Sequence, residues 1–165
     1  MNADEALQTL HLAPLDCEGG HFFRSYESEE RLPGAGNRLG SAIYYLLRGT
    51  ERSNWHRVRY SDELWFAHGP AAALQMIVAP DGSKWEIRKL GPVPENGALP
   101  QVLVPKDYWQ ATRLLTPTPG AWSLFSTAVI PEFRYEDFES TDAARLRALN
   151  PALSEVLEEF ERRSS

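Results

Sequence analysis

Short apolar segments separated by proline and glycine occur along most of this chain, and no other feature restricts its fold as much. The chain has 12 Pro and 11 Gly, which punctuate segments such as "AIYYLLRG", "AALQMIVA" and "AWSLFSTAVI". Short apolar runs with turn residues between them are typical of an all-β barrel or sandwich. We therefore predict an all-β fold with roughly nine or ten strands.

The two ends of the chain have a different pattern. Residues 2–12 predict a short N-terminal helix, and residues 141–163 predict a C-terminal helical tail. Within the tail, Asn150 is expected as an N-cap and Pro151 as the first helical residue. One apolar stripe follows at helical spacing, formed by Leu153, Val156, Leu157 and Phe160. The stripe predicts a terminal helix laid over an open face of the barrel; a helix dedicated to a protein partner is the alternative.

Composition narrows the class of protein. A chain of 165 residues is expected to form one domain, here residues 1–165. The net charge of −6 argues against nucleic-acid and anionic membrane partners, because phosphate binding requires clustered Lys and Arg. Cys17 is the one cysteine, which excludes an intrachain disulfide and a Cys-based zinc site.

Since the sequence shows no secretory signal and no apolar run of about 20 residues, we expect a cytoplasmic protein.

The stretch "NWHRVRYSDELWFAHG", residues 54–69, contains the polar residues of greatest interest. Side chains alternate along a strand, so His56 and Tyr60 are expected on one face of a strand. The same rule places Glu63 and Trp65 on one face of the next strand. If both faces point into the barrel, an imidazole, a carboxylate and an indole meet there.

Gly49, just before this region, and His56, Glu63 and Gly69 within it resemble the first motif of the cupin superfamily. That motif contains a second histidine, and Val58 stands in its place here. The resemblance therefore implies a barrel site that has lost one of its imidazoles.

Further segments extend the resemblance. "VPKDYWQA" is similar to the second cupin motif, with Pro105 retained and Gln110 where that motif has a histidine. "EGGHFFRSY", "AIYYLL" and "VIPEFRYEDFE" follow in the order typical of one branch of uncharacterised cupins, described as a domain of unknown function. The resemblance implies a double-stranded β-helix, the cupin jelly-roll barrel, over about residues 15–139, and it implies a homodimer.

A metal site at the barrel centre would be incomplete. His56 and Glu63 supply two good ligands, whereas the amide oxygen of Gln110 is a poor third ligand for a first-row transition metal. We predict no cofactor and no tightly held metal; a weakly bound divalent metal would use these three residues. Thr112 shares the expected face of Gln110, and both are predicted to contact the ligand, as is Trp65.

The remaining pair is suited to proton transfer. A carboxylate beside an imidazole favours its charged form and fixes which ring nitrogen carries the proton, so Glu63 would orient His56 as a general acid or base. A resemblance to metal-free cupin sugar epimerases implies a tyrosine opposite this pair. Tyr26, Tyr44 and Tyr60 are the candidates, and the sequence alone does not choose among them. Tyr60 is grouped with the catalytic pair, and Tyr26 and Tyr44 are grouped with the ligand-binding residues.

We therefore predict a small-molecule site inside the barrel, with epimerase-, isomerase- or lyase-like chemistry on a sugar derivative or another polar metabolite. Arg24 and Arg57 could bind a carboxylate or phosphate of the ligand at the mouth, and Arg24 is counted among the ligand-binding residues; a solvated or ion-paired arginine is the alternative for either. Three alternatives stay open: a ligand-binding module without catalysis, a metal-dependent cupin enzyme, and a His56–Glu63 pair with a purely structural role.

Overall fold

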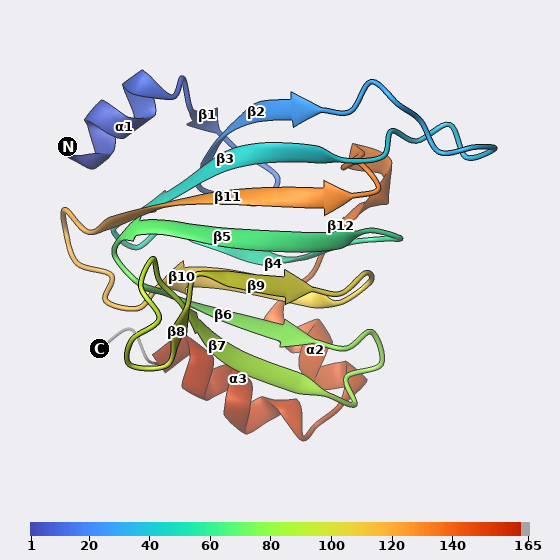
Figure 1. The fold of residues 1–165 in the computed structure, drawn as a ribbon. Helices are drawn as coiled ribbons and strands as arrows, with labels where there is room; N and C mark the ends of the chain where they lie inside the picture. Colours follow the sequence, from blue (N-terminus) through green and yellow to red (C-terminus); the bar gives the residue numbers. More distant parts are fainter. Residues whose placement is uncertain (163–165) are drawn as a thin grey trace.

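The computed structural model describes residues 1–162 and contains two six-stranded β-sheets that face each other (Figure 1). The first sheet has the order β1 (Ala13–Pro14), β2 (His21–Glu27), β3 (Ser41–Arg48), β11 (Trp122–Ile130), β5 (Asp62–Pro70) and β9 (Gln101–Val104). The second has the order β12 (Phe138–Ser140), β4 (Arg52–Val58), β10 (Trp109–Leu114), β6 (Ala73–Val78), β7 (Trp85–Leu90) and β8 (Ala98–Leu99). This architecture confirms the predicted all-β class.

Three of the strands are too short to be recognised from their own sequence. Residues 1–162 form twelve strands, whereas nine or ten were predicted. β1 and β8 have two residues each and β12 has three. Such strands are defined by the neighbour with which they pair, because two or three residues carry no readable alternation.

The helices lie at the two ends of the chain. They are α1 (Ala3–Thr9), the 3₁₀ turn η1 (Tyr135–Asp137), α2 (Ala143–Leu149) and α3 (Leu153–Arg162). A reciprocal cap of Asn2 and Glu5 starts α1, and the side chain of Asp142 accepts the amide of Arg145 to start α2. Within residues 1–162, no helix has the length and apolar character needed to cross a bilayer. Residue 163, the end of the predicted tail, lies outside the described residues.

Helix α3 covers the outer face of the second sheet, which confirms the predicted placement of its apolar stripe (Figure 1). Leu153, Leu157 and Phe160 are buried there, and the Phe160 ring lies 5.8 Å from that of Trp55. The guanidinium of Arg113 on β10 donates to the Phe160 carbonyl oxygen at 2.9 Å. The helix is therefore joined to the sheet by apolar packing and by a buried hydrogen bond.

Between the sheets, aromatic rings fill one part of the barrel and leave a polar end. The ring of Trp65 lies 5.6 Å from those of Tyr45 and Phe125 in edge-to-face contacts. At the other end, the starts of β3 and β5 lie beside the end of β11, because these neighbours are antiparallel. The end of β4 approaches from the second sheet, and β2 adds Phe22 and Arg24, so five strands contribute side chains to this end.

Candidate functional site

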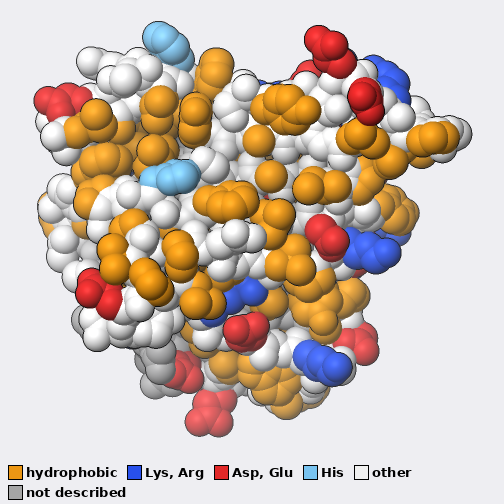
Figure 2. All heavy atoms as spheres, viewed as in Figure 1, with side chains coloured by type: hydrophobic (Ala, Val, Ile, Leu, Met, Phe, Trp, Pro, Cys, Tyr) orange, Lys and Arg blue, Asp and Glu red, His pale blue; other side chains and the backbone are white. Residues whose placement is uncertain are grey.

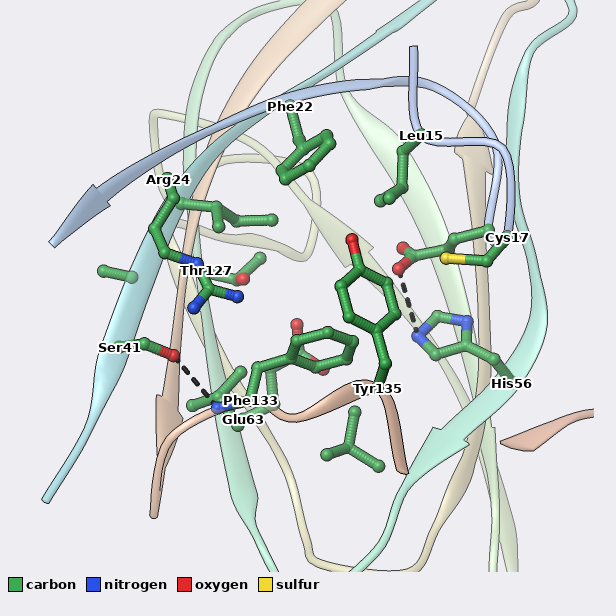
Figure 3. Close-up of a pocket in the computed structure, with 15 residues that line it drawn as sticks. Leu15, Cys17, Phe22, Arg24, Ser41, His56, Glu63, Thr127, Phe133 and Tyr135 are labelled. Carbon is green, nitrogen blue, oxygen red and sulfur yellow. Dashed lines mark hydrogen bonds and ion pairs between the residues drawn. The ribbon is translucent and has the colours of Figure 1, made fainter. Parts of the chain in front are cut away.

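A pocket opens at this end of the barrel and receives side chains from both sheets (Figure 3). Its polar lining is Cys17, Glu18, Arg24, Ser41, His56, Glu63, Thr127 and Tyr135. Its apolar walls are Leu15, Phe22, Ala42, Ile43, Val58, Val129 and Phe133. The cavity has a volume of about 40 Å³, room for a few water molecules. The structure thus brings His56 and Glu63 to one pocket.

His56 is held in one tautomer by its surroundings. Its Nδ1 lies 2.7 Å from the carbonyl oxygen of Asn54, and a carbonyl can only accept, so Nδ1 carries a proton. The ring is buried and stacks on Phe138 with centroids 5.4 Å apart. In the neutral ring, Nε2 is therefore the basic atom, and it lies 3.7 Å from Oε2 of Glu18 (Figure 3).

Glu18 is the carboxylate that pairs with His56, a place that the sequence analysis gave to Glu63. The hydroxyl of Ser53 donates to Oε1 of Glu18 at 2.6 Å, which leaves Oε2 for the imidazole. The backbone of Glu18 is also anchored, because its carbonyl oxygen accepts the amide of Asn54 at 2.8 Å. Glu18 therefore presents a carboxylate oxygen to the basic nitrogen of His56.

Two glycines place Glu18 against strand β4. Both have positive φ, +100° for Gly19 and +70° for Gly20. A Cβ on Gly19 would lie 2.3 Å from the carbonyl oxygen of Arg52, and one on Gly20 would lie 2.7 Å from the hydroxyl of Tyr45. That hydroxyl donates to the Gly19 carbonyl oxygen at 2.7 Å. Only glycine permits this approach, so the Gly-Gly pair positions Glu18 beside the imidazole.

Glu63 is buried, and its surroundings favour the protonated form more than water does. Burial raises its pKa from the usual 4.5 to about 7, and the charge of Glu18 adds to the rise. His56 and hydrogen bonds from Gln110 and Thr127 act in the opposite direction. A carboxyl group with this pKa can both accept and release a proton near pH 7.

The mouth of the pocket carries one guanidinium and two aromatic rings. Arg24 points into the pocket 6.0 Å from the ring centroid of Phe133 and pairs with the Glu27 carboxylate at the rim (Figure 3). The amide of Phe133 donates to the Ser41 hydroxyl oxygen at 3.0 Å. Tyr135 is 62% exposed, and its ring lies 5.1 Å from that of Phe133.

Three predicted ligand-binding residues lie behind the pocket rather than on its wall. The amide of Gln110 donates to Oε2 of Glu63 at 2.6 Å and accepts the indole N–H of Trp65 at 3.1 Å. The Thr112 hydroxyl oxygen accepts the amide of Gln75 at 3.1 Å. All are buried, so their contacts with the site pass through Glu63.

The three tyrosines named from the sequence are not brought to the pocket. Tyr44 is on the outer side of β3, because its neighbour Tyr45 faces the core. A β-bulge between Arg24 and Tyr26 breaks the alternation of β2 and leaves Tyr26 58% exposed. Tyr60 is in the turn after β4 with φ of +68°, also 58% exposed. Strand alternation was the reason for placing Tyr60 on the face of His56, and it fails at a turn; no side-chain direction was predicted for Tyr26 or Tyr44.

Glu18 and Tyr135 are two pocket residues with chemical potential that were not predicted from the sequence. Two consecutive glycines after Glu18 are the sequence signal of a close backbone approach at that point. Tyr135 starts η1, after strand β11, where no period indicates the direction of a side chain.

The side chains of the pocket do not fit a metal ion. Among residues 1–162, no group of three or more His, Cys, Asp and Glu side chains is arranged to share one. Gln110 cannot complete the set, since its oxygen accepts from Trp65 and its NH₂ group faces Glu63. His21 lies 3.5 Å from Glu51 instead, and His68 contacts Ser126 on the outer face.

The fold and the pocket together define the class of protein: a jelly-roll barrel with a polar site at one end. The sequence matches the family described as Cupin superfamily (DUF985) over residues 4–141. The chain therefore belongs to this family of cupins, which confirms both the predicted resemblance and the jelly-roll barrel.

Solved structures agree with this assignment. A crystal structure of a protein from Shewanella oneidensis is 31% identical, with a TM-score of 0.83 over 97% of each chain. A hypothetical protein from Leishmania major is 25% identical, with a TM-score of 0.85 over 96% of this chain and 98% of that one. A dTDP sugar isomerase from Desulfovibrio desulfuricans shares the fold at 10% identity, with a TM-score of 0.55 over 78% of this chain and 86% of that one. No match to a curated protein was found.

Proposed function

We propose that the protein binds a small polar metabolite whose reacting end enters this pocket, the rest of the ligand lying at the mouth, and moves a proton on it by means of His56 and Glu63, without a tightly held metal. One observation carries the proposal: a buried carboxyl group with a pKa of about 7 and a tautomer-locked imidazole line the same pocket. Perturbed ionisable groups in a pocket are typical of acid–base sites. Glu18 stabilises the imidazolium that forms when Nε2 takes up a proton.

The reaction class we propose is epimerisation, isomerisation or a lyase reaction on a sugar derivative or a related metabolite. The name of the Desulfovibrio desulfuricans protein supports a sugar nucleotide by analogy of fold. Tyr135 reaches the pocket from the side of η1 and takes the role foreseen for a tyrosine acid (Figure 3). Arg24, at the mouth, would hold an anionic group of the ligand.

A second candidate function is ligand binding without chemistry. It is favoured by the internal partners of the polar groups, since Glu63 already has Gln110 and His56 already has Asn54 and Glu18. In this case the same pocket would hold a ligand between apolar walls, and the polar residues would orient it.

The test is deuterium incorporation from heavy water into candidate dTDP sugars, free sugars and 2-hydroxy acids, followed by NMR. Catalysis predicts incorporation that falls about 10²–10⁴-fold in both His56→Ala and Glu63→Gln. Glu139→Gln is the control, because this carboxylate pairs with Arg57 outside the pocket. A compound that binds, shows no incorporation, and binds more weakly to Glu63→Gln would replace catalysis by the binding function.

We also propose that the protein forms a homodimer through the outer face of the first sheet. Apolar side chains gather on this face (Figure 2). They include Phe66 on β5, Leu103 on β9 and Leu124 on β11, each next to a residue that points into the barrel. A second copy would cover this face by the same contacts in both directions.

A further inference from the structure

The amide of Gln110 has one permitted orientation. The indole N–H of Trp65 can only donate, and it lies 3.1 Å from Oε1 of Gln110. Oε1 therefore faces Trp65, and Nε2 donates to Oε2 of Glu63 at 2.6 Å. Gln110 is on β10 of the second sheet, whereas the other two residues are on β5 of the first, so the amide bridges the two sheets.

A second amide fixes the first from behind. The guanidinium of Arg88 on β7 donates to Oε1 of Gln75 through Nε at 3.0 Å and Nη2 at 2.6 Å. Because a guanidinium has no acceptor, the oxygen of Gln75 must face it. The Gln75 NH₂ group then donates to the hydroxyl oxygen of Thr112 at 3.1 Å and to Oε1 of Gln110 at 3.4 Å. Each side chain thus donates a hydrogen bond to the next, from Arg88 through Gln75 and Gln110 to Glu63.

We infer that three residues behind the pocket act as positioning residues for its buried carboxyl group: Trp65, Gln75 and Arg88. They hold the amide of Gln110 with its NH₂ group on Oε2 of Glu63. That oxygen must then remain an acceptor, so a proton taken up by Glu63 is carried by Oε1. In the reversed orientation the amide oxygen would accept a proton from Oε2 and stabilise the neutral acid instead.

The orientation of the Gln110 amide therefore has a measurable effect on the pKa of Glu63. Glu18 and His56 are the charged and titratable neighbours that also act on its pKa, from the loop before β2 and from β4. The amide orientation adds a hydrogen bond to the ionised form, and a bond of this kind corresponds to about one pKa unit. The catalytic consequence rests on the proposed function, whereas the orientation itself does not.

The experiment measures the pKa of Glu63 by ¹³C NMR titration of its carboxyl carbon, with the side-chain NH₂ signals of Gln110 recorded in parallel. We expect the Glu63 pKa to rise by about one unit in Trp65→Phe and by less in Arg88→Met, with faster hydrogen exchange of the Gln110 amide. Trp55→Phe is the matched control, since the indole N–H of Trp55 is buried and has no hydrogen-bond partner among residues 1–162. It should leave the Glu63 pKa unchanged.

An unchanged Glu63 pKa in Arg88→Met and in Trp65→Phe, together with a raised pKa in Gln110→Leu, would overturn the inference. That result would show that the amide matters while these residues do not orient it. A Trp65→Phe protein that fails to fold leaves Arg88→Met as the decisive variant. The titration needs no substrate, so the absence of deuterium incorporation refutes the proposed function and leaves the positioning residues standing.

Discussion

Replacing Glu63 by glutamine should make the protein more stable than the wild type at pH 8, and the advantage should disappear by about pH 4.5. The reason is the burial of the carboxyl group between the two sheets, beside Glu18. Its ionised form is disfavoured in the folded protein, whereas in the unfolded chain it ionises freely. Glutamine has nearly the same shape and can accept the same hydrogen bond from Gln110, but it carries no charge.

The magnitude follows from the two pKa values. The folded protein holds the Glu63 proton up to about pH 7, and the unfolded chain releases it near 4.5. A raised carboxyl pKa therefore gives stability that is complete below pH 4.5 and is lost as the pH rises through 7. The loss amounts to about 3 kcal/mol at ~1.4 kcal/mol per pKa unit. In a chain of this size it corresponds to a difference in Tm on the order of 10 °C.

The assay is urea denaturation of the wild type and Glu63→Gln at matched pH values between 4 and 8.5. The difference in unfolding free energy between the two proteins isolates Glu63, because other titrating groups contribute to both. Glu139→Gln, outside the pocket, should show no comparable trend. A difference that stays constant with pH, or that favours the wild type at pH 8, would refute the raised pKa and the acid–base role built on it.

Three further predictions concern the loop, the metal and the assembly. Gly19→Ala should lower Tm and move Glu18 away from His56, because the alanine Cβ would lie 2.3 Å from the Arg52 carbonyl oxygen. Thermal denaturation tests the first effect, and NMR titration of the imidazole tests the second. The purified protein should contain less than about one equivalent of transition metal by elemental analysis, and near-stoichiometric metal that survives EDTA but is lost in His56→Ala would contradict this. Light scattering over about a hundredfold dilution should give twice the 18.6 kDa of the monomer, and Leu103→Glu should shift the mass toward one chain.

The fold was predictable from sequence because its signals are local and repeated. Segments such as β3 and β11 are long enough to show their apolar character, and turn residues separate them. The C-terminal helix was equally clear, since Leu153, Leu157 and Phe160 fall on one face and are all buried. Strands of two or three residues depend on partners far away in the chain, and no local pattern reveals them.

The site was only partly predictable, because a site is defined by what meets in space. His56 and Glu63 follow the alternation of regular strands, so their arrival in one pocket could be foreseen. Glu18 comes from a loop whose course depends on two positive-φ glycines. Its pairing with His56 therefore depends on the tertiary structure and cannot be read from the local sequence. Tyr60 was predicted on the face of His56 by alternation, but it lies in the turn after β4 with φ of +68°, where alternation does not apply.

The covering of the second sheet by α3 has a consequence for biosynthesis. Strands β4, β6 and β10 leave the ribosome well before the helix that buries their outer face. The segment between Leu114 and Phe160 takes on the order of several seconds to synthesise. During that time α3 does not yet bury Trp55 and Met76, and the nascent chain exposes the apolar side chains of these strands to its surroundings. Newly made protein should therefore need chaperone protection until the last helix emerges, and premature termination in α2 should yield aggregates.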